Sequence, residues 1–417
     1  MLKTPRGTKD ILPSEIENWQ YLESIFRKIT DKYNYKELRT PIYENTEVFS
    51  RSIGEETDIV NKEMYTFLDK GGKSMTLRPE MTASLVRSVI QHNLCSQSEI
   101  QRLWYYGPFF RYERPQKGRF RQFHQFGVEC LSSPFAESDV EIISLGTDLI
   151  NSLNINDYTL ILNSLGNQAS REKYLKQLVI YYNDNKQNLS ETSLIRLDKN
   201  PLRILDSKSS EDIAINQSAP FLDDYFDNES QEHFNEVRSL LDELKISYQL
   251  DRRLVRGLDY YSHTVFEFQS NILGAQDSFG GGGRYNDLFV QLGGKNTPAI
   301  GFAMGVERLL LILEKVNKIE QNNSLDVYIV NAGVENSNII SKIANQLRQN
   351  NYSVTNDLKR KNMKSQFKEA NKLNSKYTLV LGQDELNKNE IIIKNMDTGN
   401  QTKVSLEQLN NISLLEY

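Results

Sequence analysis

Arginine residues gather in one short stretch of this sequence, among aromatic residues. Between residues 111 and 121 Glu113 is the only acid, and the basic residues are Arg111, Arg114, Lys117, Arg119 and Arg121. Burying such cations on a pair of strands is costly without an anionic partner, and the planar guanidinium group matches a phosphate or a carboxylate. The pattern therefore indicates anion binding. A solvated basic hairpin, with the aromatic rings turned to the core, is the alternative that the pattern leaves open.

Two further arginines, Arg256 and Arg308, are candidates for the same chemistry. Arg256 is followed closely by the polar aromatics Tyr260 and Tyr261, an arrangement that fits a turn as well as a site. Arg308 falls in the first turn of a predicted helix, where the helix dipole favours acidic residues, so a cation there suggests a bound anion. Between them, four glycines at 280–283 predict a turn, which either lets the backbone approach a ligand closely or is simply strained.

Several common catalytic patterns are absent from the sequence. It has no GxxxxGK[ST] phosphate loop and no GxGxxG motif after a strand. It also has neither a CxxC pair nor an HExxH motif, so we expect no protein-bound metal, no zinc enzyme and no Ser-His-Asp enzyme. The histidines are more readily explained as structural than as catalytic residues. They are His92, His124, His233 and His263.

The candidate residues need elements that hold them together. Apolar residues spaced by three and four between Ile16 and Tyr33 predict a helix. Strands at 103–112 and 122–129 are predicted to form a hairpin whose tip, at 114–118, is basic. Further predicted elements are strands at 247–250, 264–268 and 299–305, and helices at 79–94 and 306–316.

The chain is predicted to form two domains, 1–322 and 325–417, with an Asn-rich linker at 317–324. Residues from about 168 to 238 are polar and helical in pattern, which indicates a helical insertion in the first domain. The tail alternates strands and helices and is predicted to be an α/β sheet. Its predicted strands are 327–330, 352–355, 377–381 and 391–394, and its predicted helices are 339–347 and 363–373.

Composition restricts the class of protein. The chain has 417 residues, 25% charged and 38% hydrophobic, as is usual for a globular protein. Its most apolar segment, 299–313, is interrupted by Glu307 and Arg308, so no stretch is expected to span a bilayer. Two cysteines fit a reducing compartment, and we expect a cytoplasmic protein. The net charge of −5 argues against a general basic nucleic-acid binder, although residues 325–417 hold 12 basic against 10 acidic residues.

The motifs resemble those of class II aminoacyl-tRNA synthetases. Arg111-Tyr112-Glu113 together with 119–123 is similar to motif 2 of that class, and 301–308 is similar to motif 3. The segment around Pro41 resembles motif 1, which forms dimers. Longer stretches resemble the histidyl-tRNA synthetases in particular, namely 5–10, 76–80, 114–119, 256–261 and 264–267. The resemblance spans essentially the whole chain. It implies an α+β catalytic core with an antiparallel sheet, a helical insertion and a C-terminal α/β anticodon-binding domain.

The resemblance implies ATP-dependent activation of histidine to histidyl-adenylate, then transfer to the 3′ end of tRNA(His), by a homodimer. In the first step the carboxylate of histidine attacks the α-phosphorus of ATP, which is supplied as a complex with Mg²⁺. The carboxylate is ionised near neutral pH and needs no general base. The demand on the protein is fixed positive charge where negative charge develops.

The roles of family residues carry over to matching positions. Arg256 and Arg111 are implied to be catalytic, at the α-phosphate. The residues implied to bind ATP are Arg111, Glu113, Arg119, Arg121 and Arg308. Those implied to bind histidine are Glu80, Met81, Thr82, Gln125, Glu129, Tyr260 and Tyr261. Met81 stands where bacterial relatives usually carry glycine, which leaves the shape of the pocket open. Those expected to bind tRNA are Arg114, Lys361, Lys364 and Lys368, the lysines because they share one side of a predicted helix.

A non-catalytic relative is the alternative function. The histidine-sensing regulatory subunit of ATP phosphoribosyltransferase resembles the same core, but such subunits lack the C-terminal domain and lose catalytic arginines. Here Arg111, Arg256 and Arg308 are all present and residues 325–417 are intact, so the sequence favours the enzyme. For the lysines between 361 and 368, a solvated charged face is the other interpretation.

Overall fold

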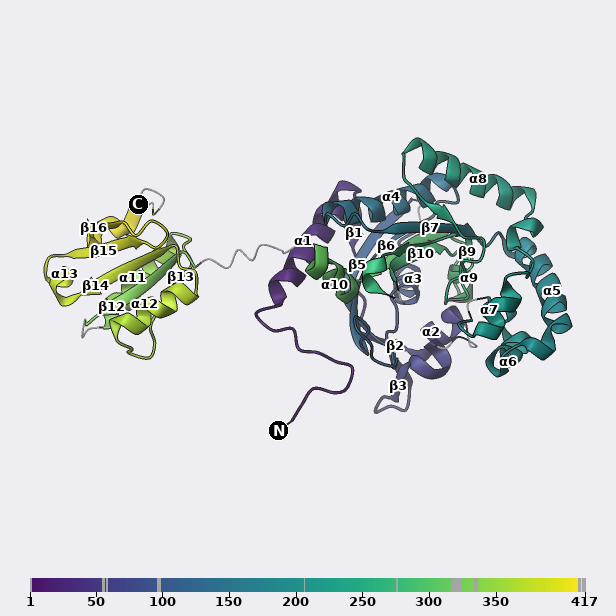
Figure 1. Ribbon diagram of the computed structural model, residues 1–417, viewed down its shortest axis with the longest axis horizontal. Coiled ribbons are helices and arrows are strands. Elements are labelled where there is room, and N and C mark those ends of the chain that lie inside the picture. The colour runs from purple at the N-terminus through teal and green to yellow at the C-terminus, as the bar shows by residue number, and fades with distance from the viewer. Residues whose placement is uncertain are drawn as a thin grey trace. The chain divides into compact units, whose positions relative to one another are not determined.

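The computed structural model describes residues 2–411 and 414, apart from 55–56, 58, 96–98, 206, 275–276, 317–324 and 334–336. The residues form two compact units, Met1–Ile319 and Glu320–Tyr417 (Figure 1). The linker predicted at 317–324 lies outside the described residues. Within the described part of the chain, no helix is both long enough and apolar enough to cross a membrane.

An eight-stranded sheet is the centre of the first unit, in the order β1-β5-β6-β11-β10-β9-β7-β8. Its strands are β1 (Lys36–Glu37), β5 (Gln101–Phe110), β6 (Gln122–Leu131), β7 (Thr159–Ser164), β8 (Gln249–Leu250), β9 (Ser262–Gln269), β10 (Ser278–Arg284) and β11 (Ala299–Gly305). Neighbouring strands are antiparallel from β5 to β7, and only the short outer strands β1 and β8 pair in parallel. The predicted α+β core with an antiparallel sheet is therefore confirmed, including the hairpin of β5 and β6.

Four helices cover one face of this sheet. They are α1 (Ile16–Lys32), α4 (Ala136–Ser152), α8 (Asn228–Glu243) and α10 (Val306–Val316). Because side chains alternate along a strand, every second residue of β6, such as Phe126 and Val128, points into this layer. The helix α1 meets it with Leu22, Phe26 and Ile29, which lie three and four residues apart as the sequence predicts.

Shorter elements lie on the opposite face and leave room for a site there. A small sheet, in the order β2-β4-β3, precedes the helix α3. The elements are β2 (Tyr43–Asn45), α2 (Thr46–Ile53), the π-helix η1 (Ile59–Glu63), β3 (Tyr65–Leu68), β4 (Ser74–Leu77), α3 (Thr82–Gln91) and α9 (Leu288–Gln291). The helix α3 packs Leu85, Val86 and Val89 against Leu103 and Tyr105 of β5.

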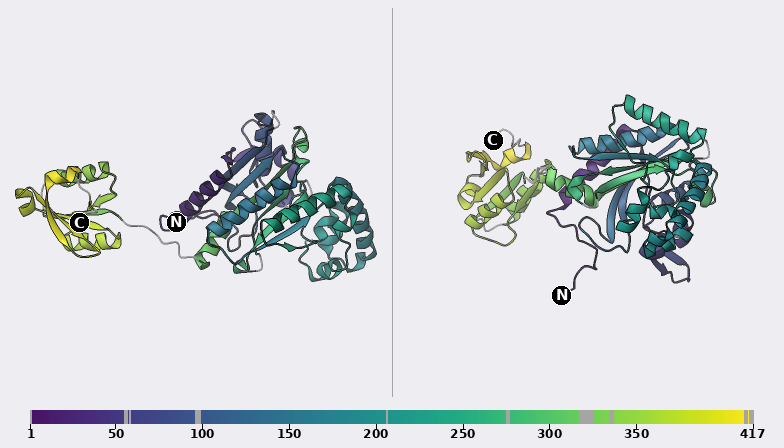
Figure 2. Two further views of the ribbon diagram at one scale, coloured as in Figure 1. Left: turned by 90° about the horizontal axis from the view of Figure 1, so that it is seen from above. Right: turned by 45° about the vertical axis from the view of Figure 1, so that its right-hand side comes forward.

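The chain leaves the sheet after β7 and forms a group of helices before it returns at β8. These helices are α5 (Gln168–Asp184), η2 (Lys186–Asn188), α6 (Glu191–Lys199), η3 (Pro201–Ile204), α7 (Ser210–Asn216) and η4 (Leu222–Tyr225), followed by α8. Their teal ribbons gather at one end of the first unit in every view (Figures 1 and 2). Asn167 and Asp227 cap α5 and α8 by accepting hydrogen bonds from the amides of Ser170 and Ser230.

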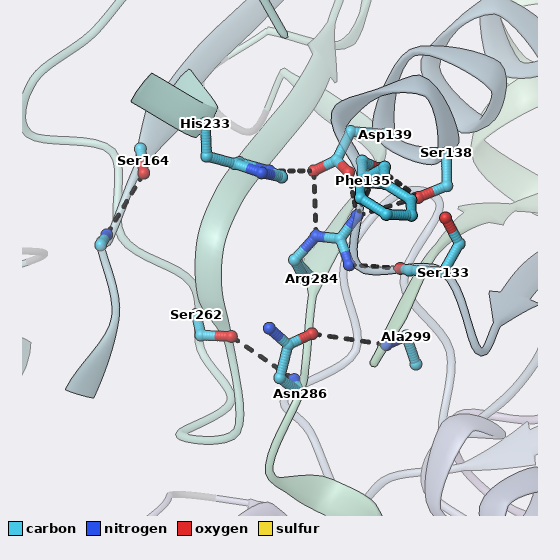
Figure 3. Close-up of polar contacts among 11 residues, drawn as sticks. Ser133, Phe135, Ser138, Asp139, Ser164, His233, Ser262, Arg284, Asn286 and Ala299 are labelled. Atoms are coloured by element: carbon cyan, nitrogen blue, oxygen red, sulfur yellow. Dashed lines mark hydrogen bonds and ion pairs between the residues drawn. The ribbon is translucent and has the colours of Figure 1, made fainter. Parts of the chain in front are cut away.

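A buried ion cluster attaches α8 to the sheet (Figure 3). Arg284, at the end of β10, forms an ion pair with Asp139 of α4, and Asp139 also contacts Nε2 of His233 on α8 at 3.3 Å. Burial alone would raise the pKa of Asp139, but the cation of Arg284 and the hydrogen bond with His233 hold it below its usual range. Nη1 and Nη2 of Arg284 also donate to the carbonyl oxygens of Ser133 and Phe135, respectively.

The turn predicted for the four glycines is wrong, because they form the buried strand β10. A Cβ atom at Gly280 would collide with the side chain of Met304 on β11, and one at Gly283 would collide with the backbone of Thr264 on β9. Glycine therefore lets β10 fit between its two neighbours. This contact across strands outweighs the low intrinsic preference of glycine for strands.

The second unit is a five-stranded sheet in the order β13-β12-β14-β15-β16, which confirms the predicted α/β domain. Its elements are β12 (Val327–Ala332), α11 (Ser337–Gln349), β13 (Val354–Asn356), α12 (Met363–Lys372), β14 (Tyr377–Gly382), α13 (Gln383–Asn387), β15 (Glu390–Asn395), β16 (Gln401–Ser405) and η6 (Leu406–Asn411). Val327 and Ile329 of β12 pack against the layer that contains α11, whereas Tyr328 and Val330 pack on the side of α12. The two helices therefore cover opposite faces.

Candidate active site

A strip of small residues crosses the open face of the large sheet. In the strand register, Gly127 of β6 lies opposite Ala303 of β11, and Ala303 lies opposite Gly281 of β10. In the next row, Gly283 lies opposite Gly301, which is the partner of Glu129. Other side chains lie closely over this shallow floor, such as the Tyr105 ring over Gly127, whereas Gly281 and Ala303 line a cavity in which a ligand can lie close to the backbone.

Glu129 rises from this floor as a buried carboxylate, only 1% exposed. The hydroxyl of Tyr285 donates to its Oε2 at 2.6 Å, and the hydroxyl of Thr82 donates to its Oε1 at 2.9 Å. A side chain at Gly301 would occupy the position of the Glu129 carboxylate, so the glycine is required there. Burial raises the pKa of Glu129 to about 8, despite these two hydrogen bonds.

Glu80 is a second buried carboxylate, at the start of α3. Its oxygens accept hydrogen bonds from the backbone amides of Thr82 at 2.6 Å and Ala83 at 2.9 Å, the donors that a helix leaves unpaired at its first turn. Burial nevertheless raises its pKa, against the opposing effect of those amides and of nearby Arg111. Each oxygen has a second lone pair for a ligand. We call Glu80, Thr82, Glu129 and Tyr285 the carboxylate cluster.

The remaining residues predicted to bind histidine surround this cluster. Tyr260 and Tyr261 are buried in one apolar layer with Met81, and the ring centres of Tyr260 and Tyr285 are 5.7 Å apart. Gln125 lies on β6 opposite Gly305 and is half-buried. The sulfur of Met81 is 3.4 Å from the hydroxyl of Thr40, so its side chain is held by the segment before β2.

Beside the cluster is a cavity of about 210 Å³, which we call the arginine cavity. The charged residues that line it are Arg111, Glu113, Arg119, Arg256, Glu307 and Arg308. Arg111 connects it to the carboxylate cluster, because its Nε donates to the carbonyl oxygen of Pro79, next to Glu80, at 2.9 Å. Burial, with the nearby cation of Arg119, lowers the pKa of Arg308 to about 10. Such a concentration of cations fits an anion with several charges.

Two acids partly balance the cations. Glu113 lies 3.4 Å from Arg119 and 3.8 Å from Arg111, and Glu267 of β9 forms an ion pair with Arg256. The guanidinium of Arg256 lies directly over Gly281, where a Cβ atom would be 2.9 Å from its Nη1. Its Nε is buried and, in the part of the chain that the structure describes, has no hydrogen-bond partner. A buried donor at a cavity wall requires an acceptor, and an anionic ligand in the cavity can supply one.

Some predicted site residues do not join these groups. Arg121 stacks on the ring of Tyr112, 3.6 Å from its centre, and donates to the carbonyl oxygen of Glu113, away from the arginine cavity. Arg114 is exposed at the hairpin tip. In the second unit Lys364 and Lys368 lie on α12, whereas Lys361 precedes that helix and forms an ion pair with Glu369.

Sequence reasoning missed two aromatic residues of the site. Tyr285, which directly follows the glycines and Arg284, supplies a hydrogen bond to Glu129, and its place at a strand end after that run was the available signal. Phe123 lines the arginine cavity, and the guanidinium of Arg111 lies 5.3 Å from the centre of its ring. In the sequence Phe123 is only one of several aromatics that flank the arginines. A flat apolar ring beside cations suits a planar, phosphate-bearing ligand.

Metal ligands are not grouped at this site. Over the ranges that the structure describes, no three His, Cys, Asp or Glu side chains lie close enough together to hold a metal ion. Cys95 and Cys130 are free thiols. The arrangement can bind an ammonium or another hydrogen-bond donor at the carboxylates and a polyanion at the arginines, with Arg111 between them.

Comparison with known proteins gives a consistent result. The model of a family described as "Histidyl-tRNA synthetase" matches residues 7–309, and one described as "Anticodon binding domain" matches 326–414. The protein named "Histidine--tRNA ligase" of Halothermothrix orenii is 46% identical over 409 residues, 98% of each chain. That of Acaryochloris marina is 47% identical over 412 residues, 99% of this chain and 96% of its own. The crystal structure of the apo histidyl-tRNA synthetase of S. aureus superimposes with a TM-score of 0.84 at 38% identity, over 98% of this chain and 99% of that one.

The raised pKa of Glu129 predicts a pH-dependent stability that a Glu129→Gln variant lacks. The folded protein keeps a proton up to about pH 8 that the unfolded chain, with an ordinary pKa of 4.5, has released. The free energy of unfolding therefore falls between those two pH values as the pH rises, on the order of 1 kcal/mol per pH unit. Glutamine resembles the protonated carboxyl and removes this term.

The measurement is urea unfolding at pH 6 and pH 8, followed by tryptophan fluorescence. Both tryptophans, Trp19 and Trp104, belong to the first unit, so the signal reports on that unit alone. We expect the parent to lose more stability than Glu129→Gln between the two pH values. The exposed Glu243 provides the control, because Glu243→Gln should behave as the parent does. Equal losses in the parent and in Glu129→Gln would contradict the assignment.

Proposed function

The chain belongs to the histidyl-tRNA synthetase family, and from this premise we propose that its carboxylate cluster binds histidine and its arginine cavity binds ATP. The protein is an aminoacyl-tRNA synthetase that attaches histidine to tRNA(His). The observation that carries the proposal is the juxtaposition of two buried carboxylates with four cavity-lining arginines, Arg111 lying between the two groups.

The regulatory-subunit alternative is not supported. The match to the ligases named above covers 98% or more of this chain at 46–47% identity, including the anticodon-binding unit at 326–414. The three arginines on which the sequence argument relied, Arg111, Arg256 and Arg308, all line the same cavity.

Histidine is bound through two groups that donate hydrogen bonds, its ammonium group and its imidazole ring. Glu80, with Thr82 and Gln125, accepts hydrogen bonds from the ammonium group, using the lone pairs that the α3 amides leave unused. Glu129 and Tyr261 receive the imidazole, with Tyr260 and Met81 closing the apolar wall. An apolar isostere of histidine would leave these buried polar groups unpaired, which gives strong discrimination.

ATP is bound with its phosphates among the arginines. Arg308 and Arg119 hold the outer phosphates, Arg111 lies between the α-phosphate and the histidine carboxylate, and Glu113 faces the adenine. A carboxylate oxygen of histidine then attacks the α-phosphorus, a new P–O bond forms, and the bond to the pyrophosphate oxygen breaks. Negative charge on the phosphoryl oxygens is stabilised by fixed cations, which need no reorganisation. Mg²⁺ enters with ATP, bound chiefly by phosphate oxygens and water.

Arg256 acts at the α-phosphate from the side opposite Arg111. Its position over Gly281 and its buried Nε support this role, because a phosphoryl oxygen would supply the missing acceptor. Arg121 is also proposed to reach the triphosphate, and this role requires its guanidinium to turn away from the ring of Tyr112.

Transfer to tRNA uses both units. In the second unit Lys364 and Lys368 on α12, with Lys361, are proposed to contact RNA phosphates, and Arg114 at the exposed hairpin tip is proposed to contact the acceptor end. Because Lys361 forms an ion pair with Glu369, its net contribution is smaller than that of the two helical lysines. A protein that charges tRNA and keeps both cysteines as thiols is proposed to work in the cytoplasm.

We also propose that two copies associate through the small sheet β2-β4-β3. Its outer surface exposes large apolar side chains, with Tyr43 53%, Phe67 45% and Leu68 70% accessible, and Ile42 adjoins them. The segment around Pro41, predicted to form dimers, leads directly into β2. Apolar groups in contact on one exposed sheet, such as the Tyr43 and Phe67 rings 6.3 Å apart, suit a second copy of the same surface.

Histidine-dependent ATP–pyrophosphate exchange tests the activation step. Arg256→Ala should lower kcat by about 100- to 1,000-fold, as expected when a donor to developing charge is removed, while histidine binding changes little. Arg348→Ala is the control, since Arg348 donates to the carbonyl oxygen of Val354 in the second unit, outside the site. Absence of exchange in the parent at saturating histidine would refute the function. An unaffected Arg256→Ala variant would refute the role of that arginine.

The salt dependence of tRNA binding tests the second unit. Replacing Lys364 and Lys368 by alanine should weaken binding and reduce the slope of log K against log salt by about 1 for each phosphate that the variant no longer neutralises. Lys342→Ala is the control, because α11 covers the opposite face of that sheet. An unchanged slope in the double variant would show that these lysines form an ordinary solvated face.

The mass of the protein in solution tests the dimer. The parent should behave as a dimer in light scattering, and Phe67→Glu should dissociate it, because a charge cannot be buried without a partner. Leu358→Glu, on an exposed position of the second unit, should leave the mass unchanged. A monomeric parent, or a Phe67→Glu variant that stays dimeric, would exclude this interface.

A further inference from the structure

The loop that carries Arg256 is held by the inserted helices. We infer that Arg171, Asn200 and Arg203 of the insertion are positioning residues for Arg256, so that the insertion forms part of the catalytic machinery. The inference rests on the role proposed above for Arg256. Its basis is a set of hydrogen bonds that reach Gly257, Asp259 and Tyr261 in the second half of the loop.

Three insertion side chains contact three loop residues. Nη2 of Arg203, on η3, donates to the carbonyl oxygen of Gly257 at 2.6 Å. Nδ2 of Asn200, just before η3, donates to the carboxylate of Asp259 at 3.1 Å. Nη1 of Arg171, on α5, donates to the carbonyl oxygen of Tyr261 at 3.0 Å.

These contacts fix the path of the backbone. Two of the three acceptors are carbonyl oxygens, so the contacts hold the main chain on which Arg256 and Tyr261 are carried, whatever the loop side chains do. The loop contains no helix or strand between Leu250 and Ser262 in the structure, and therefore lacks a ladder of its own. Arg256 directly precedes Gly257, the first residue contacted, and Tyr261 is the last residue contacted.

The catalytic core holds the same loop from the other side. The amide of Asp259 donates to the carbonyl oxygen of Ile53, the last residue of α2, at 3.3 Å. Gly54, in the left-handed region at φ +99°, follows and lies so close to the Asp259 carboxylate that a Cβ atom would overlap it. The loop is thus clamped between α2 and the insertion, with Asp259 at the centre.

Charge strengthens the clamp. Burial raises the pKa of Asp259, and Arg203, Arg171 and Asn200 oppose that rise. Burial also lowers the pKa of Arg171, with Asp259 as the first opposing charge. Separating the insertion from the loop would leave these partly buried charges without partners, which is costly. Arg196 adds to the assembly by donating to the carbonyl oxygen of Arg203 at 3.1 Å.

The insertion residues that hold the loop line the same cavity as two arginines of the proposed ATP site. A cavity of about 250 Å³ is lined both by Arg171, Arg196 and Arg203 of the insertion and by Arg111 and Arg256 of the catalytic site. A small displacement of the loop would move the Arg256 guanidinium off Gly281, and misplacement by about 1 Å can lower a rate about 100-fold. The insertion residues therefore act on catalysis through Arg256.

A double-mutant cycle tests this inference. Arg203→Ala should lower kcat of histidine-dependent ATP–pyrophosphate exchange by roughly 10- to 100-fold. Arg203→Lys should recover part of the loss, because an ammonium can still donate to the Gly257 carbonyl oxygen. In an Arg256→Ala background, Arg203→Ala should change the residual rate less than about twofold, since residues that act as a unit are not additive.

The outcomes separate this inference from the proposed function. Arg348→Ala, which removes an arginine that donates to the carbonyl oxygen of Val354 in the second unit and not to this loop, should exchange as the parent does. If Arg256→Ala is silent, the role of Arg256 fails and the inference with it. If Arg256→Ala is impaired while Arg203→Ala is silent, or is fully additive, the inference alone is overturned. A defect of Arg203→Ala in tRNA charging with normal exchange would overturn it too, and would indicate a direct contact with RNA. Unchanged tryptophan fluorescence of each variant verifies folding.

Discussion

The catalytic unit depends on a strip of the large sheet that carries almost no side chains. Gly127, Ala303 and Gly281 lie in one row across β6, β11 and β10. Because the floor is shallow, the Arg256 guanidinium can lie on Gly281 and the Glu129 carboxylate can occupy the space above Gly301. Strand positions occupied by glycine or alanine carry no charged side chain and so cannot provide the cations of the site. The arginines therefore come from the flanks, and their geometry depends on a hairpin, a loop and the first turn of α10.

The cost of removing charged groups from water determines how the carboxylates and arginines are arranged beside the strip of small residues. The carboxylate cluster is buried and its pKa values rise, whereas each cation at the cavity has an acid within reach, as Glu267 is for Arg256 and Glu113 for Arg119. Without these acids, a group of arginines around one cavity would repel one another. A polyanion can replace these acids as the partner of the arginines only if it contacts several arginines at the same time. A net charge of −5 therefore does not exclude a polyanionic ligand, because the local placement of the arginines decides binding and the total charge does not.

Most helices and strands could be predicted from local sequence patterns. The predictions that failed concern residues whose role depends on contacts with distant parts of the chain. The strand Ala299–Gly305 and the helix Val306–Val316 were predicted with their observed bounds, because their apolar runs and breaks are local. The prediction for the four glycines was wrong because the reason for them, close packing against Met304 and Thr264, lies on other strands. The hydrogen bond of Tyr285 to Glu129 escaped prediction for the same reason, because the two residues are 156 positions apart and only the place of Tyr285 after the glycine run was a local signal. Motif resemblance located the arginines, but only the structure separates Arg256, at the cavity, from Arg121, which stacks on Tyr112.

Topology places the insertion next to the loop that carries Arg256. The strands that bracket it, β7 and β8, pair with each other, so the chain leaves and re-enters at one edge of the sheet and passes straight into the loop before β9. At its far end α8 contacts the core through His233, whose Nε2 lies 3.3 Å from the buried carboxylate of Asp139, whereas α5 and η3 hold the loop chiefly through hydrogen bonds to carbonyl oxygens. The fully buried ion pair of Arg284 and Asp139 joins β10 to α4 and fixes the core on which α8 rests. The insertion is therefore fixed to the rest of the first unit at two places, at α8 and at the loop before β9, as the role inferred for Arg171, Asn200 and Arg203 requires.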